Sequence, residues 1–585
     1  MAPNAKSQYE RRPMVGWYNP ARLVRTGVEV VLSTIFGSHS DNRRFDALTA
    51  TDSGIYDYSQ PTEQDGSFWF DYAADCGDGW RSTYAVAWAH SQPTIAHGTD
   101  HLKRGGLLIL GGDLVYPTPS FRQYQDRLIG PYEDALPHPP APPRQLLVLP
   151  GNHDWYDSLK AFRRYFLSQH MYSCFTTKQT RSYFIAKLPH NWWILGVDLQ
   201  LTHDLDDEQF RFFQTRLDND IPQNANIVLC SPEPLWIKRH GHEADLNTAT
   251  SIPTLYAELE RAIGPRLKAC IAGDLHHYRR LESQDQRRIM ITCGTGGAFL
   301  HPTHVLGGVD PNGSICKRAF PDTTSSNSIS KQNLLFPLRN PKFGLLYAFL
   351  YLVTSWQTGL YVGLKTDHIS ILEIGTTPPS FTEFSEVFIA GFHSGILSPI
   401  GGLLYLFIFA GFMFFADRSS KWFRILGGWL HAFAHILVGF LIYWLAAYWS
   451  ITTLGFAPKS IPQYLTAGLI ISTLGYVFGP MLFGLYLYIS IRLFKKHPNE
   501  AFSSLKVDNW KGFLRGKVDS SGNLTLYYIG MRQIPKHWKA KEPDQPGPRW
   551  VPDGDQFTPP AVIDAITYSS DSTTWAESKN ELVDR

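Results

Sequence analysis

The sequence contains few cysteines and few charged residues for its length. Only six of its 585 residues are cysteine. They are scattered between Cys76 and Cys316, and no two of them form a CxxC motif. A secreted scaffold held together by disulfides is shorter and has a denser cysteine framework, so this class of protein is excluded. We expect most of these cysteines to be buried thiols in a reducing compartment.

Charge of either sign is scarce. Asp, Glu, Lys and Arg make up 18% of the sequence, whereas an average soluble protein has about 25%. The 54 basic and 52 acidic residues nearly cancel, and without a basic excess we expect no nucleic-acid partner. Disorder is also excluded, because 44% of the residues are hydrophobic and 14% are aromatic. The deficit of charge is typical of a chain with part of its length in lipid.

The N-terminal sequence lacks the features of a signal peptide. The first 20 residues contain no apolar run, whereas a signal peptide has one of about 7–15 residues. We therefore expect no cleaved signal. We interpret residues 1–44 as an N-terminal amphipathic, basic segment.

Four stretches lack Asp, Glu, Lys and Arg altogether. They cover residues 343–364, 387–416, 425–458 and 460–491. A helix needs about 20 apolar residues to cross a bilayer, so each stretch is long enough. We therefore expect residues 343–494 to form a transmembrane region of about four α-helices, with a kink or a re-entrant start at Pro399. The alternative is a very hydrophobic soluble core, which four such stretches in succession disfavour.

The loops between these stretches differ in charge. One side carries nine basic residues, namely Lys331, Arg339, Lys342, Arg418, Lys421, Arg424, Arg492, Lys495 and Lys496. The other side carries two, Lys365 and Lys459, among the acidic residues Asp367, Glu373, Glu383 and Glu386. The positive-inside rule places the basic side in the cytosol, together with both termini and the segment before the spans. We thus expect a multi-pass integral membrane protein.

Residues 45–330 have the pattern of an α/β domain. Short apolar runs such as GGLLILGGD and LKACIAGD alternate with helix-like stretches such as DSLKAFRRYFLSQHM. The runs end in Gly, Asp or Asn, which is the usual layout of a site at the strand ends of an open sheet. Residues 495–585 are interpreted as a separate cytosolic segment. In it, GKVDSSGNLTLYYIGM predicts a β-hairpin and the remainder predicts a flexible tail.

Four of the strand ends carry side chains that can bind metals. They are the motifs at Asp75 (ADCGD), Asp113 (GDLVY), Asn152 (GNHD) and Asp274 (GDLHHY). Carboxylate, amide and imidazole donors suit Mn, Fe or Zn, and carboxylates can bridge two ions about 3.5–4 Å apart. Glycine beside these residues lets the backbone turn tightly. One such motif is a weak signal, but four in order predict a centre for two divalent or trivalent metal ions.

At these motifs the sequence resembles the calcineurin-like metallophosphoesterases, over roughly residues 68–300. The resemblance implies a four-layer αββα sandwich with two metal ions at the carboxyl ends of its strands. It implies that Asp75 binds the first ion, Asp113 bridges both and Asn152 binds the second. It also places His153 opposite the leaving group of a phosphate ester.

Three further positions refine the resemblance. Tyr116 of GDLVY matches the purple acid phosphatase branch, in which this tyrosine ligates ferric iron. The family motif Gly-His-x-His is changed here to Gly-Asp-Leu-His, so Asp274 can supply an oxygen and His276 keeps its place on the first metal. The family also has a histidine after another strand, where this chain has LCSPE. The candidates to replace it are Cys230, Glu233, His240 and His242, and otherwise the second ion is weakly held.

The expected function is that of a membrane-anchored, metal-dependent phosphoesterase. A metal-bound hydroxide attacks phosphorus in line, while His153, protonated or hydrogen-bonding, stabilises the leaving oxygen. Asp154 is predicted to orient the imidazole of His153. The alternative is a catalytically weak membrane sensor or binding protein with a phosphoesterase-like domain, which the missing histidine favours.

The spans bear on the substrate. A flexible linker over residues 303–342 would keep the domain near the bilayer, and tethering raises the effective concentration of a membrane-resident ester. A phospholipid or lipid-linked phosphate is therefore the expected substrate. Within the spans, His431 and His435 lie four residues apart on one helix face. With His393 they are predicted either to form a metal or proton site or to be hydrogen-bonded neutral groups.

Overall fold

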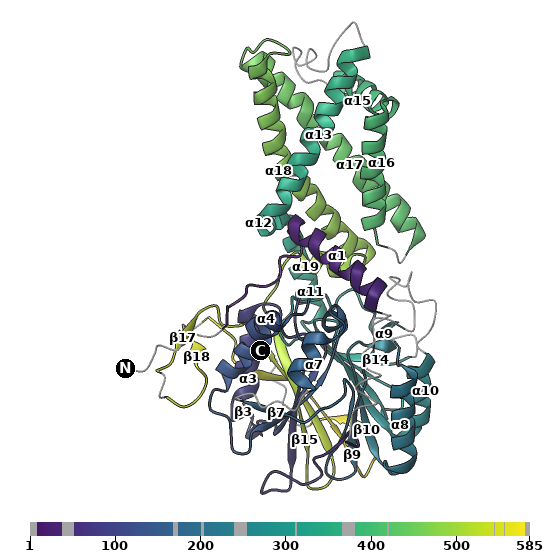
Figure 1. Ribbon diagram of the computed structural model, residues 1–585, viewed down its shortest axis with the longest axis vertical. Helices are drawn as coiled ribbons and strands as arrows, with labels where there is room; N and C mark the ends of the chain where they lie inside the picture. The colour runs from purple at the N-terminus through teal and green to yellow at the C-terminus, as the bar shows by residue number, and fades with distance from the viewer. Residues whose placement is uncertain are drawn as a thin grey trace.

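The chain folds into an α/β unit with a helical unit above it (Figure 1). The computed structural model describes residues 9–37, 52–167, 174–199, 204–238, 254–309, 313–365, 381–417, 420–542, 545–554 and 556–578. The α/β unit contains two eight-stranded mixed sheets. Two short hairpins accompany them, β3 (Thr94–His97) with β4 (Asp100–Lys103) and β17 (Trp538–Ala540) with β18 (Trp550–Pro552).

The first sheet has the order β20-β19-β16-β15-β2-β5-β6-β7. Its parallel half consists of β2 (Phe68–Ala73), β5 (Leu107–Gly111), β6 (Arg144–Leu149) and β7 (Phe175–Thr177). Its antiparallel half consists of β15 (Lys511–Val518), β16 (Leu524–Met531), β19 (Ala561–Tyr568) and β20 (Trp575–Glu577). The two halves join where β15 pairs with β2.

The second sheet has the order β1-β8-β9-β10-β11-β13-β12-β14. Its strands are β1 (Ile55–Asp57), β8 (Phe184–Lys187), β9 (Trp192–Gly196), β10 (Asn226–Ser231), β11 (Leu267–Ala272), β12 (Tyr278–Glu282), β13 (Ile289–Cys293) and β14 (Ile315–Phe320). The strands from β9 through β10 and β11 to β13 run parallel.

The two sheets face each other across a shared apolar core, and helices cover their outer faces. Along β5, Leu107 and Ile109 point into the inter-sheet core, while Leu108 and Leu110 pack beneath the outer helices. This is why the strand has an uninterrupted apolar run. The helices on this side are α3 (Trp80–Ser91), α4 (Phe121–Tyr124), α5 (Gly130–Ala135), α6 (Asn152–Trp155) and α7 (Lys160–Phe166), and those on the other are α8 (Asp207–Asn219), α9 (Leu235–Lys238) and α10 (Thr254–Ile263). The predicted α/β class with two mixed sheets is confirmed.

The C-terminal residues are an integral part of the α/β unit, which differs from the separate, flexible segment expected for residues 495–585. The predicted hairpin is present as β15 and β16, but these strands lie in the middle of the first sheet. Leu514 is paired with Tyr72 of β2, and almost every residue of both hairpin strands is buried. The hairpin pattern is visible in the sequence, whereas the partner of Leu514, which lies 442 residues earlier in the chain, is not.

Buried ion pairs join these distant segments. Asp71 on β2 accepts hydrogen bonds from Arg144 Nη2 at 2.7 Å and from Arg515 Nε at 2.7 Å. Burial alone would raise the pKa of Asp71, but the two guanidiniums together lower it below its usual value. Between the two sheets, Arg280 on β12 holds Asp564 on β19 through Nε at 2.6 Å and Nη2 at 3.0 Å.

The N-terminal segment, expected to be amphipathic and basic, packs against the α/β unit before entering α1 (Pro20–Gly37). The Tyr9 hydroxyl donates to Asp134 Oδ2 at 2.7 Å, and the Val15 amide donates to Asp78 Oδ1 at 2.6 Å. Tyr18 then lies edge-on against Phe336 and Phe343 at the base of the helical unit. Residues 9–18 therefore connect the two units.

The helical unit consists of α13 (Pro341–Lys365), α15 (Phe381–Leu397), α16 (Pro399–Phe415), α17 (Lys421–Tyr448) and α18 (Ile461–Phe494), followed by α19 (Pro498–Ser503). The stretch 387–416, expected as one span, is divided between α15 and α16. Pro399 begins the second helix and Ser398 caps it. Two helical stretches, Lys421–Thr453 and Ile461–Phe494, are long and apolar enough to cross a membrane, by length and composition only.

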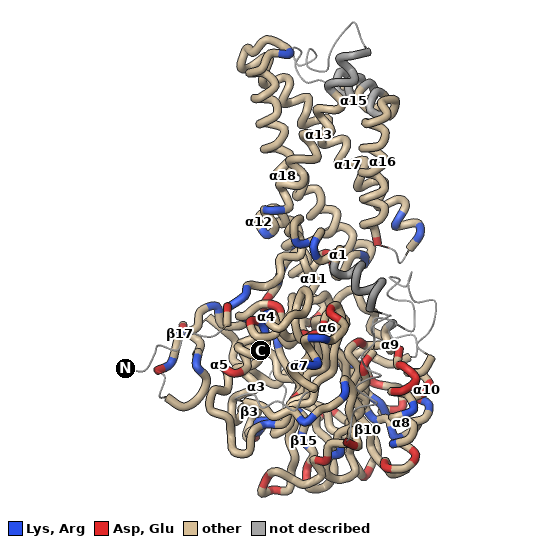
Figure 2. The backbone as a smooth tube through the Cα atoms, viewed as in Figure 1, with Lys and Arg blue, Asp and Glu red and all other residues tan. Residues whose placement is uncertain are grey.

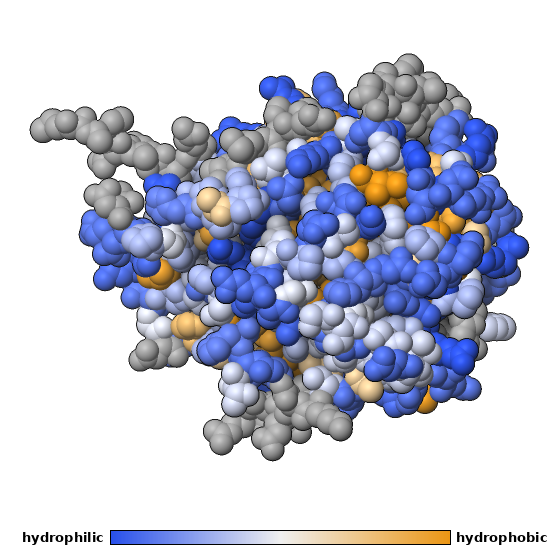
Figure 3. Space-filling view, turned by 90° about the horizontal axis from the view of Figure 1, so that it is seen from below, coloured by the Kyte–Doolittle hydropathy of each residue, from blue (hydrophilic) through white to orange (hydrophobic). Residues whose placement is uncertain are grey.

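The charges of the helical unit lie mainly at the end that adjoins the α/β unit (Figure 2). Arg418, Asp367 and Glu373 lie outside the described residues, as do the side chains of Lys365, Glu383 and Glu386. The opposite end of the α/β unit has a mainly hydrophilic surface with small apolar patches (Figure 3).

The linker between the units is structured, in contrast to the flexible tether expected for residues 303–342. After β14 it forms α11 (Thr323–Ser330), a short 3-10 turn and α12 (Phe336–Arg339). Phe336 is fully buried against Phe343 and Phe483. Asn333 and Asn340 are hydrogen-bonded to Ser504 beyond the last long helix. The α/β unit is thus packed against the helical unit.

Replacing Arg515 by methionine should lower the melting temperature of the full chain markedly. The change leaves the buried Asp71 carboxylate with one guanidinium instead of two, and removing one partner of a buried pair costs about 3–5 kcal/mol. Lys517→Met on the same strand is the control, since Lys517 is only partly buried. Thermal unfolding followed by fluorescence measures both variants, and equal melting temperatures would contradict the role given to Arg515.

Candidate metal centre

The sequence-predicted site residues follow strands of both sheets and meet at one edge of the sandwich. Asp75, Asp113 and Asn152 follow the adjacent parallel strands β2, β5 and β6. Asp274 and His276 follow β11 of the other sheet. Since the carboxyl ends of parallel neighbours lie together, side chains far apart in sequence become neighbours here.

Three of the aspartates share an uncommon backbone conformation. The φ angles of Asp75, Asp113 and Asp274 are +58°, +49° and +67°. This left-handed region is disfavoured for residues other than glycine, although aspartate tolerates it better than most. Such strained residues cluster at functional sites. All three occupy the second position after a strand.

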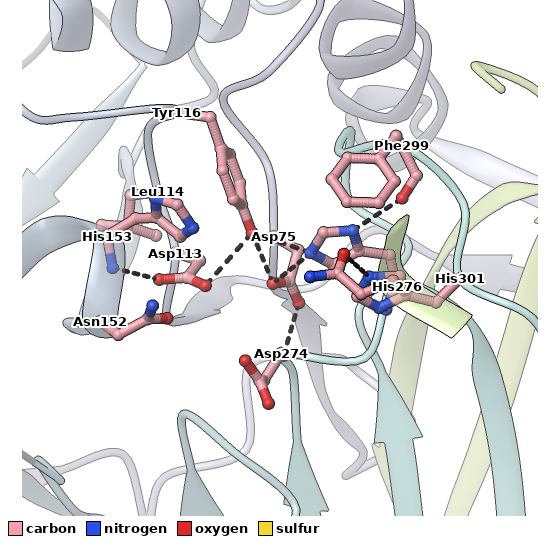
Figure 4. Close-up of polar contacts among 12 residues, drawn as sticks. Asp75, Asp113, Leu114, Tyr116, Asn152, His153, Asp274, His276, Phe299 and His301 are labelled. Atoms are coloured by element: carbon pink, nitrogen blue, oxygen red, sulfur yellow. Dashed lines mark hydrogen bonds and ion pairs between the residues drawn. The ribbon is translucent and has the colours of Figure 1, made fainter. Parts of the chain in front are cut away.

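The Tyr116 hydroxyl lies at the centre of the group (Figure 4). It is 2.8 Å from Asp75 Oδ1, 3.2 Å from Asp113 Oδ2 and 3.0 Å from His276 Nε2. His276 Nε2 is itself 3.4 Å from Asp75 Oδ1. Three of the predicted ligands, Asp75, Asp113 and His276, are therefore in contact with a fourth, Tyr116.

His276 is oriented so that the lone pair on its Nε2 faces this group. Its Nδ1 is 2.7 Å from the carbonyl oxygen of Phe299, which can only accept a hydrogen bond. Nδ1 therefore carries the hydrogen, and Nε2 bears the lone pair that faces the Tyr116 hydroxyl and could bind a metal. Burial lowers the pKa of His276 to about 3, so the ring is neutral near pH 7.

Asn152 and His153 approach Asp113 from the start of α6. The backbone amide of His153 donates to Asp113 Oδ1 at 2.9 Å. The Asn152 amide group lies between the Asp113 carboxylate and the Tyr156 hydroxyl. With its nitrogen toward Asp113 it donates to Oδ1 and Oδ2 at 3.3 and 3.0 Å. Turned over, its oxygen faces the carboxylate, the orientation in which it could ligate a cation beside Asp113.

Asp274 is bonded to Asp75 through its backbone. Its amide donates to Asp75 Oδ2 at 2.9 Å. In Figure 4 its carboxylate lies on the opposite side of Asp75 from Tyr116. The structure therefore brings Asp274 to the edge of the group, with its oxygens apart from the Tyr116 hydroxyl.

The electrostatics of the group favour a bound cation. Burial raises the pKa of Asp75 to about 7. Burial and the carboxylates of Asp75, Asp154 and Asp274 raise the pKa of Asp113 well above its usual value. A positive ion would remove this penalty, because it stabilises the ionised carboxylates.

The donor set fits a metal ion, with one qualification. Within the described part of the chain, no three His, Cys, Asp or Glu side chains are placed to hold an ion by themselves. The Tyr116 hydroxyl and the Asn152 amide are needed to complete the set, and together these oxygen and nitrogen donors suit Mn, Fe or Zn. Glycines leave space beside the Asp75 carboxylate, because a Cβ at Gly273 or Gly294 would stand 2.6 Å from Asp75 Oδ2.

No described histidine stands in the place of the one missing after β10. Pro232 packs against Gly112, where a Cβ would be 2.9 Å from the proline Cβ. Cys230 points into the inter-sheet core, and burial raises the pKa of its thiol, so it is no ligand here. Glu233 follows Pro232 and is buried. His240 and His242 lie outside the described residues.

Asp154 does not orient His153, contrary to the sequence-based expectation. Asp154 Oδ2 instead accepts from the amides of Gly151 at 2.9 Å and Leu114 at 3.1 Å, and Oδ1 accepts from the Tyr124 hydroxyl. Asp154 is the third residue of α6, and its carboxylate caps the backbone amides of the segments that carry Asp113 and Asn152. The carbonyl of Pro117, 2.7 Å from His153 Nδ1, orients the imidazole.

Two neighbours of the site were missed by the sequence analysis. Trp17 lies edge-on to His153, with ring centroids 5.9 Å apart, and to Phe299. His301 stacks on His276 at 4.1 Å, and its Nδ1 accepts from the His276 amide at 3.0 Å. Only the glycine-rich sequence before His301 hinted at a site there, and nothing in the sequence near Trp17 linked it to His153.

The histidines of the helical unit form a hydrogen-bonded chain. His435 Nε2 is 3.2 Å from His431 Nε2, and the Tyr351 hydroxyl is 2.8 Å from His435 Nδ1. His393 is exposed. These contacts of His431 and His435 are the ones predicted for hydrogen-bonded histidines inside a helical bundle.

Asp113→Asn should abolish metal retention. The change replaces one carboxylate oxygen by an amide group, and so removes the negative charge that would stabilise a bound cation beside Tyr116 and Asn152. Elemental analysis after purification with equal Mn, Fe and Zn checks this. Asp519→Asn, in the β15–β16 turn, is the control and should retain as much metal as the unchanged protein. Full metal content in Asp113→Asn would refute the assigned centre.

Comparisons with known proteins give distant structural similarity only. Neither a protein-family model nor a curated protein matches the sequence. Among solved structures, GAP50, the anchor in the inner membrane complex of Plasmodium, is similar with a TM-score of 0.31 and 12% identity over 42% of this chain and 76% of that one. The purple acid phosphatase PPD1 from yellow lupin (Lupinus luteus) seeds gives 0.29 and 14%, over 43% of this chain and 48% of that one. PhoD gives 0.27 and 11%, over 41% of this chain and 59% of that one.

Proposed function

We propose that the protein is a membrane-anchored, metal-dependent phosphoesterase. The observation that carries the proposal is the convergence of Asp75, Asp113, Tyr116 and His276 from two sheets onto one point, with contacts between 2.8 and 3.4 Å. Oxygen-rich donor sets at strand ends, with an imidazole, are suited to ions that bind phosphate oxygens.

The chain's own residues divide the work of the site. Asp75, Tyr116 and His276 would hold a first ion, Asn152 and Asp274 would hold a second, and Asp113 would serve both. Bound ions supply positive charge that polarises a phosphate ester and acidifies water. The Pro117 and Phe299 carbonyls orient His153 and His276, so that each Nε2 faces the group.

His153 acts on the leaving oxygen. Its Nδ1 hydrogen is used by the Pro117 carbonyl, and burial lowers the pKa of the ring to about 4. The free imidazole is therefore neutral and accepts at Nε2 near pH 7. The negative charge of a bound phosphate would favour protonation, after which Nε2 could donate its proton to the leaving oxygen. Trp17 of the N-terminal segment packs edge-on against this ring.

A second function is favoured by one observation. In the described part of the loop after β10, Pro232 and Glu233 stand where a histidine ligand is expected. A site that holds only one ion firmly would bind a phosphate ester but turn it over little. A protein with such a site would act as a membrane sensor. The metal content and the activity distinguish the two functions.

The membrane anchor is supported by the surface of the helical unit. Large apolar side chains are exposed on α16 and α18, including Leu403, Phe407, Phe414, Leu465 and Leu469. In the most apolar 18-residue stretch of each of the two long helices, only 39% and 33% of the residues are buried, whereas a core helix of a soluble protein is mostly buried. The basic residues gather beside the α/β unit (Figure 2), which the positive-inside rule places in the cytosol.

The substrate that fits this arrangement is a phospholipid or lipid-linked phosphate on the cytosolic leaflet. The structured linker packs the α/β unit against the helices rather than tethering it loosely. If the helices span a bilayer, the site is held at a fixed distance from it, and a membrane-resident ester would be presented to the site at high effective concentration.

The full protein should hydrolyse phosphate esters only when metal is present. A panel of phosphomonoesters and phosphodiesters, in solution and in vesicles, measures this, and the vesicle-borne esters should be preferred. His153→Ala should keep its metal and lose about 10²–10⁴-fold in kcat, the usual contribution of a general acid. His138→Ala, an exposed histidine, should leave the rate unchanged. Full activity of His153→Ala on every substrate would contradict the proposal.

Reporter tags should reveal an even number of membrane crossings. Tags at residues 5, 420 and 580 are expected in the cytosol, and tags at 375 and 456 outside, because the basic loops stay on the cytosolic side. Protease protection of tagged cells measures each position. Tags at 5 and 580 on opposite faces would rule out this topology.

A further inference from the structure

A second cavity lies at the junction of the two units. It has a volume of about 100 Å³ and is lined by residues of β12, of the segment after β13 and of the chain that follows α18. A water molecule needs about 10–15 Å³ by this measure, so the cavity has room for a small polyatomic group. It is separate from the candidate metal centre, because none of the predicted metal ligands lines it.

A buried arginine in the wall of this cavity lacks a counter-ion. Arg279 is only 6% exposed. Its guanidinium donates to the Gly307 carbonyl and, through Nε at 3.3 Å, to Cys316 Sγ. Neither partner carries a full negative charge, and no described carboxylate pairs with Arg279. A buried cation without an anion is costly, so the cavity favours an anionic ligand.

The neighbouring histidine is also without a partner. His277 is 1% exposed, and neither of its ring nitrogens has a hydrogen-bond partner among the described residues. Buried polar side chains are nearly always hydrogen-bonded. Since His277 also lines the cavity, a ligand there would supply the missing partner.

The remaining lining completes an amphiphilic site. Lys495, exposed at the end of α18, adds a second cation, and no Asp or Glu lines the cavity. The apolar part is formed by Ile237, Leu281, Val305 and Leu306. Guanidinium and ammonium groups together recognise phosphate, and apolar walls suit a group attached to an alkyl chain.

We propose that this cavity binds a phosphate group, either free or in the headgroup of a lipid. Its lining residues Lys495, Pro498 and Asn499 directly follow the last long helix. If that helix spans the bilayer, the cavity lies at the depth of the lipid headgroups. His301 separates it from the metal centre: it lines the cavity, stacks on His276, and its Nε2 is 3.2 Å from Asn499 Oδ1. Occupancy of the cavity can therefore influence the orientation of His276.

Binding of inorganic phosphate to the full-length protein in detergent tests the site. The metal is first removed with a chelator, so that the metal centre contributes no affinity and the result does not depend on hydrolysis. Phosphate should raise the melting temperature of the unchanged protein, because a ligand that binds only the folded state stabilises it. Arg279→Gln and Lys495→Gln should each weaken binding, by at least tenfold for Arg279→Gln.

A matched control and a lipid arm complete the experiment. Lys331→Gln removes an exposed lysine outside the cavity and should bind phosphate as the unchanged protein does. Vesicles of phosphatidylcholine with phosphatidic acid should displace phosphate if the source is a lipid headgroup, and should fail to displace it if the source is free phosphate.

Three results would overturn the proposal. The first is that the unchanged protein binds no phosphate. The second is that Lys495→Gln binds phosphate as tightly as the unchanged protein. The third is that Lys331→Gln and Lys495→Gln weaken phosphate binding equally. The last would indicate attraction to a generally basic surface. Because Lys495 is exposed, its variant decides the matter even if Arg279→Gln does not fold.

Discussion

The buried carboxylate of Asp71 is the interaction on which the rest of the structure depends. It lies on β2 and is held by Arg144 of β6 and Arg515 of β15. An unpaired charge at this depth would be strongly destabilising. The two arginines therefore fix the position of the C-terminal hairpin relative to the strands that carry Asp75 and Asn152. The Arg280–Asp564 pair has the same effect between the two sheets.

This framework makes the crowding at the candidate site possible. Asp75, Asp113 and Asp274 are kept close together with left-handed backbones, although burial raises the pKa of Asp75, and burial and neighbouring carboxylates raise the pKa of Asp113. The surrounding core supplies the free energy for such an arrangement, which local interactions alone would not sustain. Asp154 contributes by tying the Gly151 and Leu114 amides together, and so holds the loops that carry two of the ligands.

The junction between the units places the site relative to the helices. Tyr18 and Phe336 pack with Phe343 and Phe483 at the base of the helical unit. From the same region, Asn499 contacts His301, which stacks on His276. A chain of direct contacts thus connects the end of α18 with the candidate metal centre.

The sequence by itself determined the local features. Apolar runs ending in Asp or Asn predicted the strands and the candidate ligands at their ends, because strand period and glycine turns are local properties. Stretches without charge likewise predicted the long helices, and GKVDSSGNLTLYYIGM predicted a hairpin. Only the tertiary structure decided which segments lie side by side. It inserted the C-terminal hairpin beside β2, brought Trp17 to His153, and gave the Pro117 carbonyl the place expected for Asp154. These outcomes depend on pairing across hundreds of residues, where burial and buried charge select the partner, and no local pattern records that choice.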